Sequence, residues 1–213
     1  MEEGNIRAIR CIGESMKTNI IMVGMDHWED FTLPAILSFQ KHEPDANIIL
    51  VDHGVNPYPE TEGVEIIRLD RPAPYSVALN IGISHDKADW YFITNNDVLC
   101  EGPFIQKMRY DVIYANKTFS SGDNFWFDNC FVFISHLVWS EVGEFDEKFL
   151  MAAFEDADYS FRAQEKGFHV SQRDMPFQHF EGTTRTRMAD YSAIRFDNLV
   201  YLQNKYPERS LAW

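Results

Sequence analysis

Two polar segments of the sequence carry residue types that could bind a metal ion or move a proton. The first, Asn95-Asn96-Asp97, directly follows the apolar run of residues 90–93. A carboxylate at the end of a buried strand suits a hard cation such as Mg²⁺ or Mn²⁺. Such a cation would bridge two phosphates and neutralise a departing diphosphate. Taken alone, this tripeptide is more typical of an ordinary turn.

The second segment begins at Glu155 and Asp156, at the start of a helix predicted over residues 155–166. Carboxylates in a first helical turn are stabilised by the helix dipole, and one of them could take a proton from an attacking hydroxyl. Asp158 and Arg162 have the spacing of an i,i+4 ion pair, which accounts for both as structural residues. It does not account for Asp156, which is therefore the candidate base, with Glu155 beside it.

Three further residues extend this candidate site. The imidazole of His179 can complete a metal site, although a lone histidine is more often structural. The ring of Trp126 would either stack on a sugar or pack beneath a loop, and both interpretations are equally good. Trp126 and the nearby Asp128 are assigned to the acceptor side of the site.

The elements that must position these residues follow from the hydrophobic pattern. Buried strands are predicted over residues 19–25, 47–52, 64–69 and 89–94. Helices are predicted between them, one capped by Asp30 or Thr32 with Pro34 in its first turn, and one over residues 75–85. This alternation indicates a single α/β domain with a mostly parallel sheet flanked by helices.

Three of these strands end in polar residues, namely Asp26-His27, Asp52-His53 and Asn95-Asn96-Asp97. Ligands of open α/β sheets bind beyond the carboxyl ends of the strands, so parallel strands would bring all three ends to one edge. Solvated turns explain polar strand ends equally well.

The second half of the sequence is less regular. We expect the following elements there: a helix over 103–115, a loop over 120–124, strands over 131–134 and 168–170, and helices over 155–166 and 188–205. Residues 1–18 are a lead-in or an edge strand. Residues 19–98 and 99–213 are then the two halves of one domain.

Composition narrows the class of protein. The net charge of −14 over 213 residues disfavours general binding of nucleic acids, although a local basic patch would still permit contacts. Three widely spaced cysteines do not make a disulfide framework. The sequence shows no signal peptide and no stretch of about 20 apolar residues, so we expect a cytoplasmic protein without a transmembrane segment.

Taken in order over residues 19–182, these segments resemble the family 2-type glycosyltransferases of the GT-A fold. Val51-Asp52 resembles the family's VD at the end of the second strand, and residues 78–83, with Asn80, resemble its "arN-x-Gi" helix. Asn95-Asn96-Asp97 resembles the DXD motif, and residues 143–158 resemble its specific G-x-FDE…ED-x-D segment. His179 resembles a late histidine that joins the metal in some members.

The resemblance implies a Rossmann-like GT-A domain that moves a sugar from a nucleotide-diphosphate donor, most simply a UDP-sugar, to an acceptor hydroxyl with inversion. It implies Mn²⁺ or Mg²⁺ as the cofactor, a nucleotide-sugar-binding half over residues 19–98 and an acceptor-binding half over residues 99–213. The implied roles are as follows: catalysis by Asp156 and Glu155; donor binding by Asp26, Asp52, Asn80, Asn95 and Asn96; metal binding by Asp97 and His179; acceptor binding by Trp126 and Asp128. The sequence departs from the family pattern at Asn95, where DXD begins with Asp, and at residues 53–55.

Two other functions are compatible with such a scaffold. A sugar nucleotidyltransferase would carry a Gly-rich, Arg-containing loop after the first strand, where this chain has Met25-Asp26-His27-Trp28. A non-catalytic nucleotide- or sugar-binding protein is the alternative that Asn95 keeps open. The acceptor would be a glycan, a lipid-linked glycan or another hydroxyl compound such as a protein, and a base in DNA is disfavoured by charge.

Overall fold

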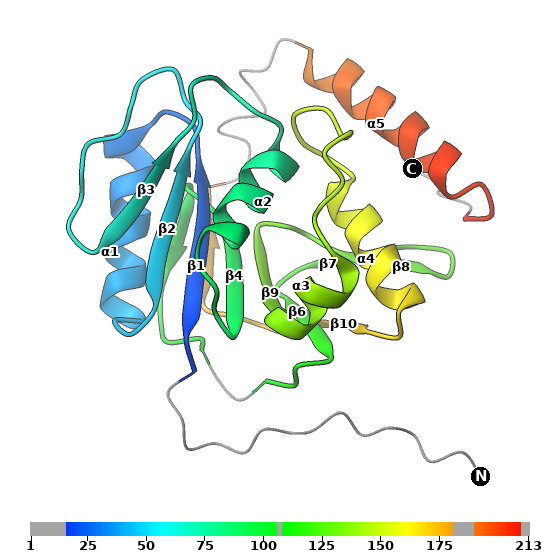
Figure 1. Ribbon diagram of the computed structural model, residues 1–213, viewed down its shortest axis with the longest axis horizontal. Coiled ribbons are helices and arrows are strands. Elements are labelled where there is room, and N and C mark those ends of the chain that lie inside the picture. The colour runs from blue at the N-terminus through cyan, green and yellow to red at the C-terminus, as the bar shows by residue number, and fades with distance from the viewer. Residues whose placement is uncertain (1–15, 106–107, 181–189, 210–213) are drawn as a thin grey trace.

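The computed structural model describes residues 16–105, 108–180 and 190–209, and shows a central sheet with helices on both faces (Figure 1). The seven strands of this sheet lie in the order β10-β6-β9-β4-β1-β2-β3. Their bounds are β1 Thr18–Gly24, β2 Asn47–Asp52, β3 Val64–Arg68, β4 Trp90–Asn95, β6 Val112–Ala115, β9 Phe131–Ser135 and β10 His169–Gln172. Two small sheets pair β5 Val98–Cys100 with β11 Phe177–His179, and β7 Thr118–Ser121 with β8 Asn124–Phe127.

The predicted parallel arrangement is confirmed for the first half of the chain. Strand β1 is parallel to both β2 and β4, and β2 is parallel to β3. In this register Gly24 lies opposite Asp52, and Val23 lies opposite Asn95. The polar residues that follow these strands are therefore gathered at one edge. Strand β9, predicted over 131–134, is present but runs antiparallel to both β4 and β6.

Two hydrophobic clusters cover the two faces of the sheet, because side chains alternate along each strand. Ile21 and Val23 of β1 pack in the cluster that contains helix α2 (Tyr75–His85), whereas Ile20 and Met22 pack against α1 (Leu33–His42). Helix α2 approaches the sheet closely at Gly82, where an added Cβ would lie 2.7 Å from Cγ2 of Ile21.

The start of α1 differs from the prediction. One π-helical turn, η1 (Trp28–Thr32), leads directly into the helix, and neither Asp30 nor Thr32 caps it with a side-chain hydrogen bond. The hydroxyl of Thr32 instead donates to the Tyr58 hydroxyl at 3.2 Å and accepts from Nδ2 of Asn96 at 2.8 Å. Thr32 thus joins the first strand end to the fourth, and Pro34 lies within the first turn of α1 as predicted.

One prediction for the second half is wrong, and a second is right only for the turn at residues 122–123. Residues 103–115 form no helix in the described part of that stretch: β-branched Val112 and Ile113 lie instead in strand β6, paired with β9 and β10. The predicted loop over 120–124 is a β-hairpin, in which the turn between β7 and β8 uses the positive φ of 58° at Gly122.

The remaining helices pack beside the second half of the sheet. Helix α3 (His136–Val142) was not predicted; the Ser135 side chain caps it by accepting from the Val138 N–H at 3.1 Å. Helix α4 (Glu155–Glu165) and helix α5 (Tyr191–Lys205) agree with the prediction, apart from residues 188–189, which lie outside the described residues. None of the helices in the described ranges is long and apolar enough to cross a membrane.

Candidate active site

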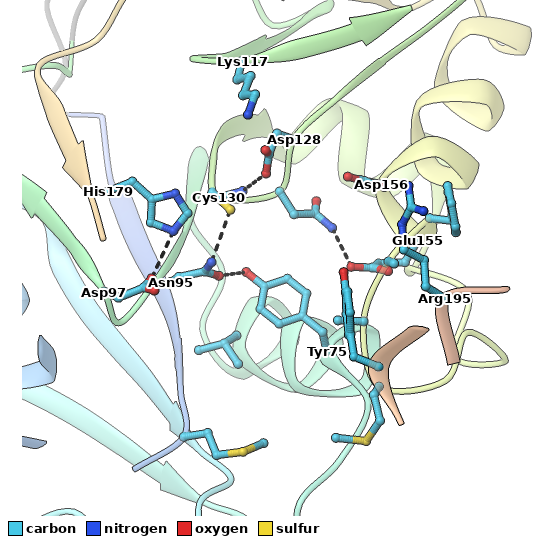
Figure 2. A pocket seen from close by; sticks show the side chains of 18 of the residues that line it. Tyr75, Asn95, Asp97, Lys117, Asp128, Cys130, Glu155, Asp156, His179 and Arg195 are labelled. Atoms are coloured by element: carbon cyan, nitrogen blue, oxygen red, sulfur yellow. Dashed lines mark hydrogen bonds and ion pairs between the residues drawn. The ribbon is translucent and has the colours of Figure 1, made fainter. Parts of the chain in front are cut away.

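A cavity of about 410 Å³ lies at the edge of the sheet where β1 and β4 end. All but three of the predicted site residues line it, which places Asn95, Asn96, Asp97, Trp126, Asp128, Glu155, Asp156 and His179 in one cavity. Figure 2 shows Asp97 and His179 on one side of this cavity and Glu155 and Asp156 on the other. One wall thus combines a residue after β4 with a residue of β11, and the other comes from the start of α4.

The pairing of β5 with β11 brings Asp97 and His179 together. In this small antiparallel sheet His179 lies opposite Val98, and the backbone N–H of Phe180 donates to the Asp97 carbonyl at 3.0 Å. As a result, Nε2 of His179 is 3.2 Å from Oδ1 of Asp97, and both side chains are largely buried. Phe131 holds the imidazole edge-on, with ring centroids 5.3 Å apart.

A carboxylate oxygen and an imidazole nitrogen are suitable ligands for Mn²⁺ or Mg²⁺. Among the described residues no group of three or more His, Cys, Asp or Glu side chains could hold a metal ion. Asp97 and His179 form an adjacent pair of side chains of the kind that can bind such a cation. This fits the way such cations are usually bound, through one or two protein groups together with the phosphates of a substrate.

Asn95 lies between the two walls, and hydrogen bonds within the protein occupy both ends of its amide (Figure 2). Its Oδ1 accepts from the Tyr75 hydroxyl at 2.7 Å, and its Nδ2 donates to Sγ of Cys130 at 3.2 Å. Burial raises the pKa of Tyr75 well above its usual value, so the phenol keeps the proton that it donates. Asn95 is thus tied to the floor of the cavity.

The acidic wall consists of Asp128, which follows β8, and of Glu155 and Asp156 at the start of α4. Asn129 Nδ2 donates to Oε1 of Glu155 at 3.3 Å, while Asp128 Oδ1 accepts from the Cys130 N–H at 3.0 Å. Burial raises the pKa of Glu155, and the charge of Asp128 adds to that rise. Burial, followed by the charges of Glu155 and Asp128, raises the pKa of Asp156 well above the ordinary value for an aspartate.

The backbone that leads into α4 has an unusual conformation. Met151, Ala153 and Phe154 have φ angles of 50°, 99° and 70°, in the left-handed region that residues other than glycine seldom adopt. These residues line the cavity directly before Glu155 and Asp156. Such conformations cluster at functional sites, where the surrounding structure must hold them in place.

Asp26 and Asp52, two of the three predicted residues outside the cavity, bond to the protein itself. Oδ1 of Asp52 accepts from the Gly54 N–H at 3.1 Å and pairs with Arg68 at 2.6 Å, while its Oδ2 accepts from the Tyr58 N–H at 2.8 Å. Oδ1 of Asp26 accepts from the Val55 N–H at 3.2 Å. Both carboxylates therefore hold the segment that follows β2.

Asn80, the third, joins α2 to the segment before α4. Its Nδ2 donates to the Phe145 carbonyl at 2.9 Å and to Oε1 of Glu147 at 3.0 Å, and its Oδ1 accepts from the Phe145 N–H at 2.8 Å. The side chain is buried and lies outside the cavity. Asn96 does line the cavity, yet its amide donates at 2.8 Å to the Thr32 hydroxyl beside the first strand end.

The aromatic surface of the cavity is less accessible than the sequence suggests. Trp126 lines the cavity but is 2% exposed, because its ring packs against Phe161 and beneath Phe119. Phe119, its cross-strand partner in the hairpin, is 36% exposed and also lines the cavity. Phe119 therefore offers more surface to a ligand than Trp126 does.

Sequence reasoning missed several residues of this cavity, among them Tyr75, Lys117, Asn129, Cys130 and Arg195. The helices that carry Tyr75 and Arg195 were predicted, but their position beside the cavity is set by tertiary packing. Only Asn129 and Cys130 carried a usable signal, since they directly follow Asp128 in the sequence. Lys117 and Arg195 lie on opposite sides of the acidic wall in Figure 2 and bring positive charge to an otherwise acidic cavity.

The amino-acid sequence matches no protein-family model and no curated protein. Solved structures do match the fold. GalNAc-T7, determined with UDP, GalNAc and Mn²⁺, superposes with a TM-score of 0.63 and 10% identity over 77% of this chain and 44% of its own. The mannosyltransferase PcManGT from Pyrobaculum calidifontis, in complex with GDP-Man and Mn²⁺, superposes with a TM-score of 0.58 and 12% identity.

The match to PcManGT covers 94% of this chain and 66% of the mannosyltransferase. The catalytic domain of Drosophila β1,4-galactosyltransferase 7, in complex with xylobiose, gives a TM-score of 0.55 and 12% identity over 80% of this chain and 74% of its own. This chain thus spans less than two thirds of the length of the first two structures. These likenesses, together with the mostly parallel sheet, show that the chain has the GT-A fold of glycosyltransferases.

Proposed function

We propose that this protein is a metal-dependent glycosyltransferase, which moves a sugar from a nucleotide-diphosphate donor to an acceptor hydroxyl. One observation carries the proposal: a single cavity holds a carboxylate–imidazole pair on one wall and a pair of carboxylates with raised pKa on the other. The first pair suits a diphosphate with its cation, and the second suits a hydroxyl that must lose its proton. The structural neighbours that bind UDP or GDP-Man with Mn²⁺ support the same donor class.

Asp97 and His179 would hold Mn²⁺ or Mg²⁺ beside the donor. A cation bound there would neutralise negative charge on the departing diphosphate. The amides of Asn95 and Asn96 lie beside Asp97, and their hydrogen bonds to Tyr75 and Thr32 fix this part of the cavity. The protein's contribution on this wall is to orient the diphosphate and the sugar.

On the opposite wall, Asp156 would take the proton of the acceptor hydroxyl. The oxygen forms its bond to the anomeric carbon as the bond from that carbon to the diphosphate oxygen breaks, which inverts the anomeric centre. A raised pKa suits this role, because a base whose pKa lies nearer the working pH is the more effective acceptor of a proton. Glu155, which accepts a hydrogen bond from Asn129, either keeps this wall negatively charged or shares a proton with Asp156.

Donor binding is tested by thermal unfolding of the full chain with UDP, GDP, CDP or dTDP, each with Mn²⁺ or with EDTA. A ligand that binds only the native state raises the free energy of unfolding, by about 2.7 kcal/mol at 100 times its Kd. The melting temperature rises accordingly. A rise that one nucleotide gives only with the metal supports the donor site and names the base. No rise with any nucleotide at saturating concentration contradicts the proposal.

A positive result leads to the sugar conjugates of that nucleotide, assayed for hydrolysis and for transfer to glycan and lipid-linked acceptors. UDP-sugars are the first choice of donor. Binding without hydrolysis or transfer would favour a non-catalytic binding protein on the same scaffold.

A further inference from the structure

The segment that carries the acidic wall depends on helix α5 for its shape. Residues 151–154 line the cavity, three of them have left-handed backbone conformations, and Glu155 and Asp156 follow directly. Isolated segments do not keep such a conformation, so neighbouring groups must hold it. The orientation of the Asp156 side chain therefore depends on the residues that hold this segment.

Asn198 of α5 supplies most of these hydrogen bonds. Its Oδ1 accepts from the Leu150 N–H at 2.8 Å, and its Nδ2 donates to the Leu150 carbonyl at 2.8 Å. The same Nδ2 donates to the Ala153 carbonyl at 3.1 Å and to the Ala152 carbonyl at 3.3 Å. The side chain is 1% exposed, so water does not replace these bonds.

Other contacts place α5 as a wall of the cavity. Tyr191 and Arg195 line the cavity. They lie seven and three positions before Asn198, and therefore on the same face of the helix. The guanidinium of Arg195 lies over the ring of Phe154, 5.2 Å from its centroid. From the other side, the Tyr75 N–H of α2 donates to the Met151 carbonyl at 2.5 Å.

We propose that Asn198 is a positioning residue, which holds the segment 150–154 with its three left-handed residues in place and thereby aims Asp156 at the acceptor hydroxyl. Its effect on transfer rests on the proposed function, whereas its effect on the loop does not. An amide suits this position because its oxygen accepts from one backbone N–H while its NH₂ group donates to several carbonyls.

Two variants of the full chain test this role. Asn198→Ala removes every side-chain hydrogen bond to the loop. Asn198→Asp keeps an acceptor for the Leu150 N–H, but it replaces the NH₂ donor with an oxygen that the backbone carbonyls repel. Asn204→Ala is the matched control, because Asn204 is an exposed asparagine on the same helix. Hydrogen exchange read at the Leu150 amide should speed up at least about tenfold in Asn198→Ala and stay unchanged in the control.

In a transfer assay, both Asn198 variants should lower kcat on the order of 100-fold while KM for the nucleotide-sugar stays within about threefold. The nucleotide-induced rise in melting temperature should persist, since Asp97 and His179 are untouched. Unchanged Leu150 exchange, an unchanged kcat, or loss of nucleotide binding together with kcat would each overturn the positioning role. A wild-type protein that binds no nucleotide and transfers nothing contradicts the proposed function, and the exchange result then decides the positioning role alone.

Discussion

At the scale of single residues, burying the carboxyls of the acidic wall lowers the stability of the fold, and the same burial suits Asp156 to its proposed role as a base. Glu155 is buried beside Asp128, and Asp156 lines the same cavity. The protein tolerates this crowding although each carboxyl would ionise more easily in water, which is what a raised pKa means. Asp158, two residues further on, is equally buried but is paired with Arg162 and Lys205, so it is explained by structure alone.

Asp156→Asn tests the base. We expect transfer to fall on the order of 10²- to 10⁴-fold, because the amide cannot accept the hydroxyl proton. Nucleotide binding with Mn²⁺ should be nearly unchanged, since Asp97 and His179 lie on the opposite wall. Steady-state kinetics and thermal unfolding measure the two effects, with Asp123→Asn in the exposed hairpin turn as the control. Loss of nucleotide binding in parallel with transfer would argue against the base assignment.

The same carboxyls predict a pH dependence of stability. Because the folded-state pKa values of Glu155 and Asp156 are raised, the native state binds more protons than the unfolded chain above the ordinary carboxyl pKa of about 4. Their contribution to the free energy of unfolding is therefore fully present below that pH and is lost as pH rises through the raised values.

Glu155→Gln and Asp156→Asn should accordingly raise the melting temperature of the metal-free protein at pH 8 and have little effect at pH 4. Unfolding followed by circular dichroism over this range measures the difference between variant and wild type. A variant that is equally destabilised at both pH values would contradict the assigned pKa directions.

At the scale of elements, the hydrophobic pattern predicted those parts whose sequence is dominated by burial. Strands β1, β2 and β4 are mostly apolar runs, and helices α1 and α2 precede β2 and β4, so their parallel arrangement could be predicted. Strands β6, β7 and β8 have only four residues each, so none of them has an alternating pattern long enough to identify.

The site, like the fold, could be predicted where it depends on the strands and could not be predicted where it depends on loops and tertiary contacts. Parallel strand ends meet at one edge, and this placed Asn95, Asn96 and Asp97 beside the cavity. The pattern could not show that Asp52 would satisfy its carboxylate with backbone N–H groups and Arg68, because those partners come from the loop after β2 and from the end of β3. The contribution of α5 was equally hidden, since its contacts are set by tertiary packing.

Gly82 tests how closely α2 must approach the sheet. In Gly82→Ala, the new Cβ would meet Cγ2 of Ile21 at 2.7 Å and Cγ2 of Val51 at 3.0 Å. Overpacking of this kind costs about 1–3 kcal/mol, and the better helix propensity of alanine returns about 1 kcal/mol. We expect a net loss of stability in urea unfolding. Gly102→Ala is the control, because its Cβ would meet Pro176 at an ordinary 3.5 Å; equal stability of both variants would refute the close approach.

At the scale of the whole molecule, the charge distribution sets which ligands the cavity can attract. A net charge of −14 repels polyanions at long range, whereas Lys117 and Arg195 at the cavity act only over short distances. A nucleotide-sugar carries a few negative charges, so screening by salt should weaken the long-range repulsion more than the local attraction.

Apparent affinity for the nucleotide identified by thermal unfolding should therefore stay level or improve as ionic strength rises from about 10 mM to about 200 mM, at constant free Mn²⁺. Duplex DNA should show no saturable binding over the same range, because a DNA-binding protein would lose affinity steeply with salt. Calorimetric titration measures the first and fluorescence anisotropy the second. A strong, salt-sensitive interaction with DNA would show that a local basic surface outweighs the net charge, and it would move the acceptor from glycans toward nucleic acids.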